Sequence, residues 1–291
     1  MSKTLVIAEK ASVGQDLANA LPGTFKKKRE GYLESDDYVV TWAVGHLVTL
    51  AEPDDYVEAW KKWRMEDLPI VPETFKLKPR DAKSSKRLKL IHKLLEREDI
   101  DGVINACDAG REGELIFAYV MDTAENGSGA LSDSGSGDEW SHSVERLWIS
   151  SMTKQAIREG FDELRPGSEL RALEQAARSR SEADWVVGMN ATRAATLKVG
   201  FSGGVLSLGR VQTPTLALIV KREREIQEFV PEPYWLVHGT FEAPSRAGYT
   251  GLWFAPEPDL AERDQSRIKD EQRSEEIVAR VSGQEGTVAS V

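Results

Sequence analysis

The stretch from Gly102 to Ile116 limits the possible folds of this chain more than any other segment. Its first part, Gly102 to Cys107, is a short apolar run that starts at a glycine, which is typical of a buried strand. The run from Leu115 to Met121 predicts a packed helix. A strand followed at once by a helix is the repeating unit of open α/β sheets, which bind ligands beyond the carboxyl ends of their strands. The stretch therefore predicts an α/β fold with a site between strand and helix.

Three carboxylates and one arginine occupy this predicted site: Asp108, Glu112, Glu114 and Arg111. Carboxylates that lie close together repel one another unless a cation sits among them, and hard oxygen ligands suit Mg²⁺. The simpler interpretation is that these acids only favour the start of a helix, where the macrodipole stabilises negative charge. Because Arg111 lies among them, flanked by Gly110 and Gly113, the pattern favours a metal-dependent site that handles phosphate.

A second strand also ends in charged residues. Thr4 to Ala8 predicts a buried strand, Glu9 and Lys10 follow it, and a helix is expected from about Val13 to Leu21. Taken alone, Glu9 and Lys10 would be an ordinary surface turn. Because two strand ends of one sheet can face the same crevice, we expect Glu9 to lie near Asp108 and Glu112.

Composition sets broad limits on the class of protein. The chain has 291 residues, 40% of them hydrophobic, enough for buried cores in roughly two or three domains. It has no apolar run of membrane-spanning length and no signal peptide, so we expect a soluble protein with no membrane partner. The single cysteine, Cys107, excludes an internal disulfide and indicates a core thiol in a reducing cytoplasm.

The formal net charge of -10 argues against a uniformly basic nucleic-acid binder. Basic residues nevertheless gather in two places, Lys26 to Arg29 and Lys76 to Arg97. Such clusters can bind phosphate backbones, but each of them alone is at least as easily an ordinary solvated face.

The remaining first half continues the α/β pattern. Further elements are predicted as a hairpin of Tyr32 to Leu33 with Tyr38 to Val44, a helix from Ser84 to Glu98 and a strand from Val144 to Ile149. Residues 125–138 are rich in glycine and serine and predict a flexible insertion. His46 could take part in proton transfer, although a turn residue with a satisfied hydrogen bond is the favoured interpretation. Trp60 and Trp63 are expected to pack, although aromatic rings can also stack on bases.

Beyond Ser151 the pattern changes to successive helices. They are predicted at Thr153 to Leu164, at Glu169 to Leu197 with an interruption conceivable at Gly188, and at about Pro214 to Gln227 with Thr213 as N-cap. Arg180 and Asp184, four residues apart, can pair across one turn. Arg210 and Gln212 flank a helix start that could seat a phosphate, or that could be a plain capped helix. Strands follow at Trp235 to Glu242 and Tyr249 to Phe254, and Pro256 to Glu276 is polar.

These residues resemble the type IA DNA topoisomerases, and among them the bacterial topoisomerase III-like branch. Five ordered motifs carry the resemblance, from residue 3 to about 240: Glu9-Lys10, the acidic motif from Asp108 to Glu114, Arg146 to Met152, Arg180 to Asn190 and Ser207 to Leu216. The resemblance implies a Toprim domain (1–152), with a mostly parallel sheet flanked by helices and the insertion at 125–138. It further implies a helical, winged-helix-like DNA-binding segment (153–232) and an incomplete start of a β-rich arch domain (233–291).

The resemblance also implies a reaction. A tyrosine hydroxyl attacks a phosphodiester of single-stranded DNA, a covalent phosphotyrosyl intermediate conserves the bond energy without ATP, and the break is resealed after strand passage. Carried onto this sequence, Glu9 would protonate the leaving oxygen, Lys10 would hold the scissile phosphate and Arg111 would organise the acidic cluster.

The same resemblance implies the ligands of the site. Mg²⁺ would be bound by Asp108 and Glu112, with Glu9 and Glu114 assisting. The single strand would be held by Arg180, Asp184, Arg210 and Gln212. We therefore expect a monomer that acts on single-stranded or underwound DNA in the cytoplasm, in association with the nucleoid.

The sequence departs from the family pattern in two ways. Gly110 stands where many members carry a second aspartate, which removes one metal ligand. The family's nucleophile is a tyrosine followed by proline and arginine, and none of the 6 tyrosines here has that context. We therefore expect an N-terminal part that does not cleave DNA by itself.

Two other function classes keep the same acidic site. One is a Toprim nuclease or primase, in which metal-activated water or a nucleotide replaces the tyrosine. The motifs at Arg146 and Ser207 speak against it, because such enzymes would not need the helical segment. The other is a non-catalytic module that binds single-stranded DNA.

Overall fold

The computed structural model describes residues 2–28, 30–125, 143–200, 204–242, 248–255 and 262–287. The predicted glycine- and serine-rich insertion falls almost entirely outside these residues. Contacts divide the chain into two compact units, Met1–Thr215 and Leu216–Val291. None of the helices within the described ranges is long and apolar enough to cross a membrane.

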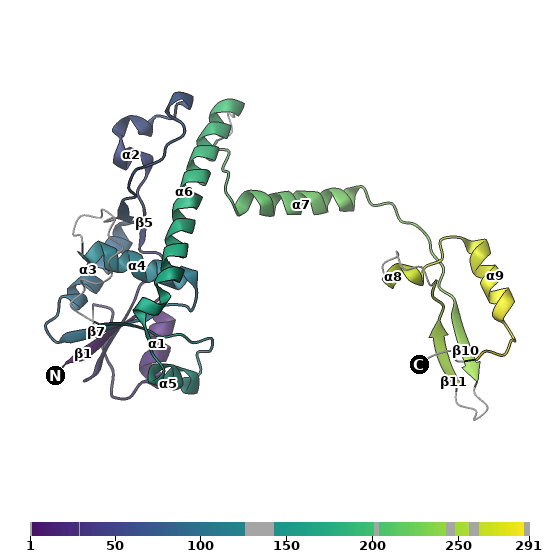
Figure 1. The fold of residues 1–291 in the computed structure, drawn as a ribbon, viewed down its shortest axis with the longest axis horizontal. Coiled ribbons are helices and arrows are strands. Elements are labelled where there is room, and N and C mark those ends of the chain that lie inside the picture. Colours follow the sequence, from purple (N-terminus) through teal and green to yellow (C-terminus); the bar gives the residue numbers. More distant parts are fainter. Residues whose placement is uncertain are drawn as a thin grey trace. The chain divides into compact units, whose positions relative to one another are not determined.

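A mixed sheet of seven strands forms the centre of the first unit (Figure 1), in the order β2-β3-β4-β1-β7-β8-β9. Four neighbouring strands, β4, β1, β7 and β8, run parallel, and the outer strands pair antiparallel. The strands are β1 (Lys3–Ala8), β2 (Lys26–Lys27), β3 (Leu33–Glu34), β4 (Tyr38–Trp42), β7 (Ile100–Ala106), β8 (Ser143–Arg146) and β9 (Arg165–Pro166). The predicted α/β class with a mostly parallel sheet is confirmed.

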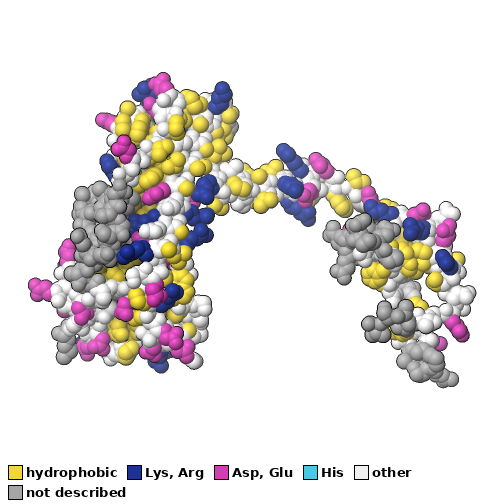
Figure 2. Space-filling view, in the orientation of Figure 1, with side chains coloured by type: hydrophobic (Ala, Val, Ile, Leu, Met, Phe, Trp, Pro, Cys, Tyr) yellow, Lys and Arg dark blue, Asp and Glu magenta, His cyan; other side chains and the backbone are white. Residues whose placement is uncertain are grey.

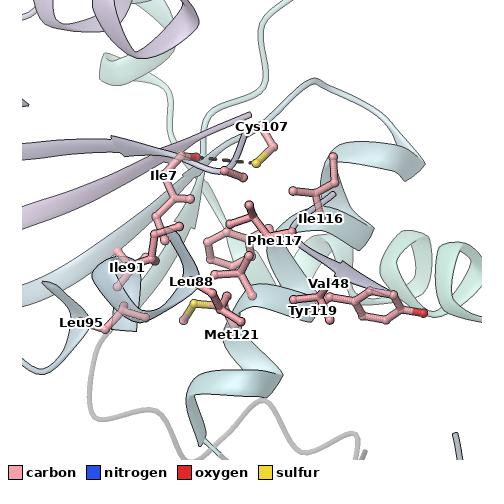
Figure 3. Close-up of a cluster of buried hydrophobic side chains, with 14 of the residues drawn as sticks. Ile7, Val48, Leu88, Ile91, Leu95, Cys107, Ile116, Phe117, Tyr119 and Met121 are labelled. Carbon is pink, nitrogen blue, oxygen red and sulfur yellow. Dashed lines mark hydrogen bonds between the residues drawn. The ribbon is translucent and has the colours of Figure 1, made fainter. Parts of the chain in front are cut away.

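Helices cover both faces of this sheet. They are α1 (Ala11–Ala20), α3 (Ala82–Leu95), α4 (Arg111–Glu125), α5 (Lys154–Asp162) and α6 (Arg171–Val199). Residues of β1, β4 and β7 alternate between two hydrophobic clusters, as expected for strands buried on both faces. One cluster includes residues of α3 and α4, with Leu88, Phe117 and Tyr119 (Figure 3), and the other includes residues of α1 and α5.

Smaller elements complete the first unit between β4 and α3. They are β5 (Val48–Leu50), α2 (Pro53–Tyr56), two short 3-10 helices (Glu58–Lys61 and Met65–Asp67) and β6 (Leu77–Pro79), and a third 3-10 turn (Gly167–Leu170) precedes α6. The long helix α6 is fastened to this region by polar contacts. The Asn190 side chain makes two hydrogen bonds to the backbone of Ile70, and Trp185 donates to the carbonyl of Ala51. The Arg193 guanidinium carbon lies over the Trp63 ring, 5.2 Å from the ring centre. This contact agrees with the prediction that Trp63 is a packing residue.

The second unit contains most of α7 (Gln212–Gln227), the antiparallel pair β10 (His238–Glu242) and β11 (Gly248–Leu252), and the helices α8 (Glu262–Gln265) and α9 (Glu271–Val281). The predicted strands of this part are confirmed in type, with shorter bounds. Hydrophobic side chains of α7, among them Leu216, Leu218 and Ile219, are exposed along the helix (Figure 2).

The predicted N-cap at Thr213 is wrong. Helix α7 begins at Gln212, before Thr213, and the Thr213 hydroxyl accepts a hydrogen bond from Gly209 N at 3.0 Å. Helix α6 continues through Gly188 without the interruption that the sequence allowed. The polar stretch before Ile277 contains the start of α9, which is capped by the Asp270 side chain. Capping and loop contacts, which hydrophobic periodicity does not report, decide where α7 and α9 begin.

The predicted boundary between residues 152 and 153 stays a prediction. Ile157 of α5 and Leu147 at the end of β8 lie in the same buried cluster, and Ala177 of α6 belongs to the core around α3 and α4. The sheet and the helical segment up to Thr215 therefore pack as one unit.

Candidate functional site

The carboxyl ends of β1 and β7 bring Glu9 and Asp108 together. The two strands are parallel neighbours with Ala8 opposite Ala106, so the residues that follow them lie at the same sheet edge. Glu9 is 7% exposed, and its carboxylate lies 2.9 Å from the Lys10 ammonium. The Asp108 carboxyl lies close enough to Glu9 and Lys10 for the charges of the three groups to interact. A buried acid, a second acid and a lysine thus share one small space at the position predicted from the sequence.

The charges of these three groups influence one another. Burial raises the pKa of Asp108, and the nearby Glu9 carboxylate raises it further. The hydrogen bond to Glu9, together with the charges of Glu9 and Asp108, raises the pKa of Lys10. The site therefore favours any species that adds positive charge between the two acids, whether a proton or a cation.

The loop after β4 reaches the same edge. Gly45 N donates a hydrogen bond of 3.0 Å to the carbonyl of Glu9, and His46 next to it pairs with Glu112 of α4. His46 thus has a hydrogen-bond partner, as the turn interpretation expects, and that partner is one of the predicted metal ligands. Val44 has a left-handed backbone with φ of 69° although it is β-branched, a conformation that is costly for such residues.

Glu112 and Arg111 lie on the exposed first turn of α4. The side chain of Glu112 is 68% exposed. Within the described ranges, the Arg111 guanidinium has no hydrogen-bond or ion-pair partner, and no three His, Cys, Asp or Glu side chains form a ready-made metal site. Glu112 is therefore an exposed side chain that would have to turn toward Glu9 and Asp108 to join them as a ligand.

Glu114 has a different environment from the other acids. It is 6% exposed, and its Oε1 accepts a hydrogen bond of 2.6 Å from Nε of Arg146, while its Oε2 accepts one from Asn105. Burial raises the pKa of Glu114, and the charge of Arg146 opposes that shift. Because both carboxylate oxygens already have partners inside the protein, the structure gives Glu114 a supporting position behind the site.

Arg146 is the residue that sequence reasoning about the site overlooked. Its guanidinium, 1% exposed, donates to the backbone carbonyls of Asn105, Cys107, Asp108 and Leu147 at 2.6–3.1 Å. It thereby joins the end of β7 to the end of β8 and fixes the backbone of Asp108. The signal available in the sequence was an arginine inside the predicted strand from Val144 to Ile149, and the structure makes it the buried residue of β8.

The predicted DNA-binding residues form a second group on α6 and on the loop before α7. Arg210 Nη1 lies 3.0 Å from Oδ1 of Asp184, and Arg180 Nε lies 3.8 Å from the other oxygen of the same carboxylate. Gln212 donates to the hydroxyl of Ser207. The structure therefore brings Arg180, Asp184 and Arg210 together, all of them partly exposed.

Hydrogen bonds along α6 hold this loop in place. The Thr192 hydroxyl donates to the carbonyl of Leu208 and accepts from its N–H, and the Thr196 hydroxyl accepts from Leu206 N. Asp184, Gly188, Thr192 and Thr196 are spaced four residues apart and therefore share one helix face. The loop lies along that face and delivers Arg210 to Asp184.

The sheet, its flanking helices and the acidic pair at the strand ends define a Toprim-type α/β domain. Comparison with family models agrees, since residues 4–133 match the Toprim domain and residues 168–291 match the DNA topoisomerase family. The chain belongs to the type IA DNA topoisomerases, in the topoisomerase III-like branch.

Similar proteins carry the name DNA topoisomerase 3. The one from Bacillus subtilis (strain 168) is 47% identical over 253 residues, which cover 87% of this chain and 31% of the relative. The one from Staphylococcus epidermidis is 41% identical over 289 residues, covering 99% of this chain and 36% of the relative. The chain therefore spans about a third of the length of the curated relatives it matches. Topoisomerases with a Toprim domain depend in general on metal ions.

Proposed function

We propose that this chain supplies the phosphate- and metal-binding half of a type IA topoisomerase site. In the proposed reaction, a tyrosine oxygen from outside these 291 residues attacks a phosphodiester of single-stranded DNA. A bond forms between this oxygen and the phosphorus, the bond to the 3′ oxygen breaks, and resealing reverses both changes. The observation that carries the proposal is the meeting of Glu9, Asp108 and Lys10 at the carboxyl ends of the paired strands β1 and β7.

Each of the three residues has a role that its environment supports. Burial and the Glu9 charge raise the pKa of Asp108, so this pair of acids takes up a proton more readily than a lone carboxyl, and Glu9 would pass it to the departing 3′ oxygen. The Lys10 ammonium is exposed and stays protonated, because both acids raise its pKa, and it can pair with a phosphate oxygen. Arg111 on the exposed turn of α4 adds a second cation for the phosphate.

The acidic residues fit Mg²⁺ by the chemistry of their donors. Glu9 and Asp108 offer hard carboxylate oxygens close together, and Asp108 has a raised pKa that a bound cation would relieve. Glu112 can complete the set by turning on its exposed helix end, whereas Glu114 stays paired with Arg146. When bound, Mg²⁺ would neutralise charge at the phosphate.

The second group is proposed to hold the single strand. Arg210 uses one nitrogen for Asp184, and the other N–H groups of its fork can bind a phosphate oxygen. Arg180 and Gln212 stand beside it. We further propose that the protein acts as a monomer on single-stranded or underwound DNA of the cytoplasmic nucleoid.

A binding assay tests the proposal directly. The chain is mixed with Mg²⁺ and an end-labelled single-stranded oligonucleotide, and both binding and strand cleavage are followed. We expect binding without cleavage, and at least a several-fold loss of affinity in Lys10→Ala and Arg210→Ala. Lys62→Ala, at an exposed lysine that pairs with no acid in the described part of the chain, is the matched control. Hydrolysis of the strand by the chain alone would favour the nuclease class instead.

Reconstitution tests the missing half of the site. The segment of a relative that carries the family's tyrosine is added to the chain, and relaxation of underwound plasmid is measured. Relaxation that is lost in Glu9→Gln supports the proposed role of this residue. Full relaxation in Glu9→Gln and Asp108→Asn would contradict it.

A further inference from the structure

The outer face of α3 carries a row of four lysines that the proposed reaction does not use. The helix spans Ala82–Leu95, and within it Lys83, Lys86, Lys89 and Lys93 follow one another at intervals of three or four residues, all exposed. We call this set the lysine row. The helix contains no acidic residue, although the whole chain has a formal net charge of -10.

None of the four ammonium groups has an ion-pair partner within the described part of the chain. By contrast, Lys3 and Lys28 both form ion pairs with Glu34. Four like charges on one helix face repel one another, and no carboxylate of the described residues forms an ion pair with any of them. Such a row is therefore available for an anionic partner.

The row is held rigidly from behind. The opposite face of α3 is buried through Leu88, Ile91, Leu94 and Leu95, and Asp81 caps the first turn. Arg87 points inward, where its guanidinium donates to Trp42 O, Gly31 O and the Thr41 hydroxyl at 2.6–2.8 Å. The helix therefore presents its lysines from a fixed backbone, which lowers the entropy lost on binding.

We propose that the lysine row binds the phosphate backbone of duplex DNA. The row extends about 15 Å along a straight helix, and this length of duplex axis carries about nine phosphate charges. Proteins that hold single strands combine a basic groove with aromatic side chains that stack on the bases. The row is instead convex, and α3 contains no Phe, Tyr or Trp. These features suit a backbone whose bases are already paired.

This contact goes beyond the proposed cleavage site and does not depend on its chemistry. A protein that opens one strand of underwound DNA meets duplex on either side of the opened region. The lysine row would give the chain a second contact, to that flanking duplex. It would contribute affinity without reading sequence, as backbone contacts do.

The salt dependence of binding tests the proposal. The four lysines are changed to glutamine, which has a similar helix propensity, and affinities for a blunt duplex and for a single-stranded oligonucleotide are measured from 50 to 200 mM salt. For the parent chain, the logarithm of the duplex affinity falls linearly with the logarithm of the salt concentration. In the variant, this slope should become shallower by up to about 3.6, since each lost phosphate contact removes about 0.9. The single-strand slope should stay the same.

A matched variant controls for net charge. Lys61, Lys62, Lys154 and Lys221 are also exposed and form no ion pair with any described residue, so changing these four to glutamine alters the charge equally. An unchanged duplex slope in the lysine-row variant would overturn the proposal, as would an equal fall in the control. If the slope for single strands fell as much as the slope for duplex in the lysine-row variant, the proposal that the row binds duplex DNA would be overturned. Circular dichroism confirms that each variant is folded, and Lys10→Ala, measured separately, reports on the cleavage site.

Discussion

Gly110 and Gly113 lie in the same acidic motif, but their surroundings differ. A Cβ atom at Gly113 would lie 2.0 Å from the carbonyl oxygen of Asp108, because the first turn of α4 packs directly on that backbone. A Cβ at Gly110 would meet nothing within 4 Å. Gly113 is thus required by a close approach that positions Asp108, whereas the space at Gly110 is open.

Gly113→Ala should therefore destabilise the protein by about 2–3 kcal/mol, since the backbone of Asp108 must move. Gly110→Ala, three residues away, should change the free energy of unfolding by less than about 0.5 kcal/mol. Urea denaturation of both variants measures the difference. Equal stabilities would show that the close contact is not present in solution.

Gly110→Asp should place an additional carboxylate in the acidic motif without steric cost. We expect it to raise the affinity for Mg²⁺ several-fold, because the cation gains an oxygen ligand, and to lower stability slightly without metal, because like charges approach. Isothermal titration with Mg²⁺ tests this, with Gly110→Asn as the uncharged control. An affinity no higher than that of the parent chain would place residue 110 outside the metal's reach.

At the scale of elements, one buried ion pair connects β7, β8 and α4. Arg146 closes the ends of the two strands, and Glu114 on α4 neutralises it at 2.6 Å. The arrangement holds the loop of Asp108 from behind while leaving its carboxyl free for the site. A buried charge that loses its partner is costly, so the two residues depend on one another.

Arg146→Met should cost about 3–5 kcal/mol, because Glu114 and several carbonyls lose their donor. Glu114→Gln should cost less, since its amide can still hydrogen-bond, and the double variant should cost less than the sum. Chemical denaturation of all three proteins gives the coupling energy. Strict additivity would mean that the two side chains do not interact in solution.

A second charge cluster joins β1, β3 and the segment after α3, and it predicts a dependence on pH. Burial raises the pKa of Glu34, but hydrogen bonds from Lys3, Arg97 and Lys28 outweigh burial and lower this pKa to about 2. Because the folded-state pKa lies below the usual 4.5, the carboxylate stabilises the fold above pH 4.5. This contribution is lost as the pH falls toward 2.

Glu34→Gln should therefore lower stability at pH 7 by about 1 kcal/mol and flatten the decline of stability between pH 4.5 and 2. Urea denaturation at a series of pH values measures both effects. Asp36→Asn, at an exposed neighbouring acid, is the control and should follow the parent curve. A parental slope in Glu34→Gln would show that this carboxyl does not carry the acid response.

On the scale of the whole molecule, hydrogen bonds and an ion pair hold the helical segment against the Toprim domain. Asn190 and Trp185 bind backbone atoms of the segment between β4 and α3, and Arg178 of α6 pairs with Asp122 of α4. The loop that carries Arg210 is fixed to the same helix through Thr192 and Thr196. The proposed cleavage site and the proposed strand-binding group thus belong to one compact unit.

The sequence alone determined the class of fold and the place of the site. Buried strands at Thr4 to Ala8 and Gly102 to Cys107, with acids just beyond them, followed from apolar runs and their boundaries, which are local properties of the chain. The parallel pairing of these strands then made the meeting of Glu9 with Asp108 foreseeable.

Only the tertiary structure decided what each acid does. The resemblance implied an assisting role for Glu114 beside the ligand Glu112, but only the structure shows that Glu114 is buried against Arg146 and that Glu112 is exposed beside His46. Their partners lie 32 and 66 residues away in the sequence, and no local pattern specifies a contact of that kind. The seating of the Arg210 loop on α6 also depends on contacts between residues far apart in the sequence, and the need for glycine at 113 depends on how closely the first turn of α4 approaches the backbone of Asp108.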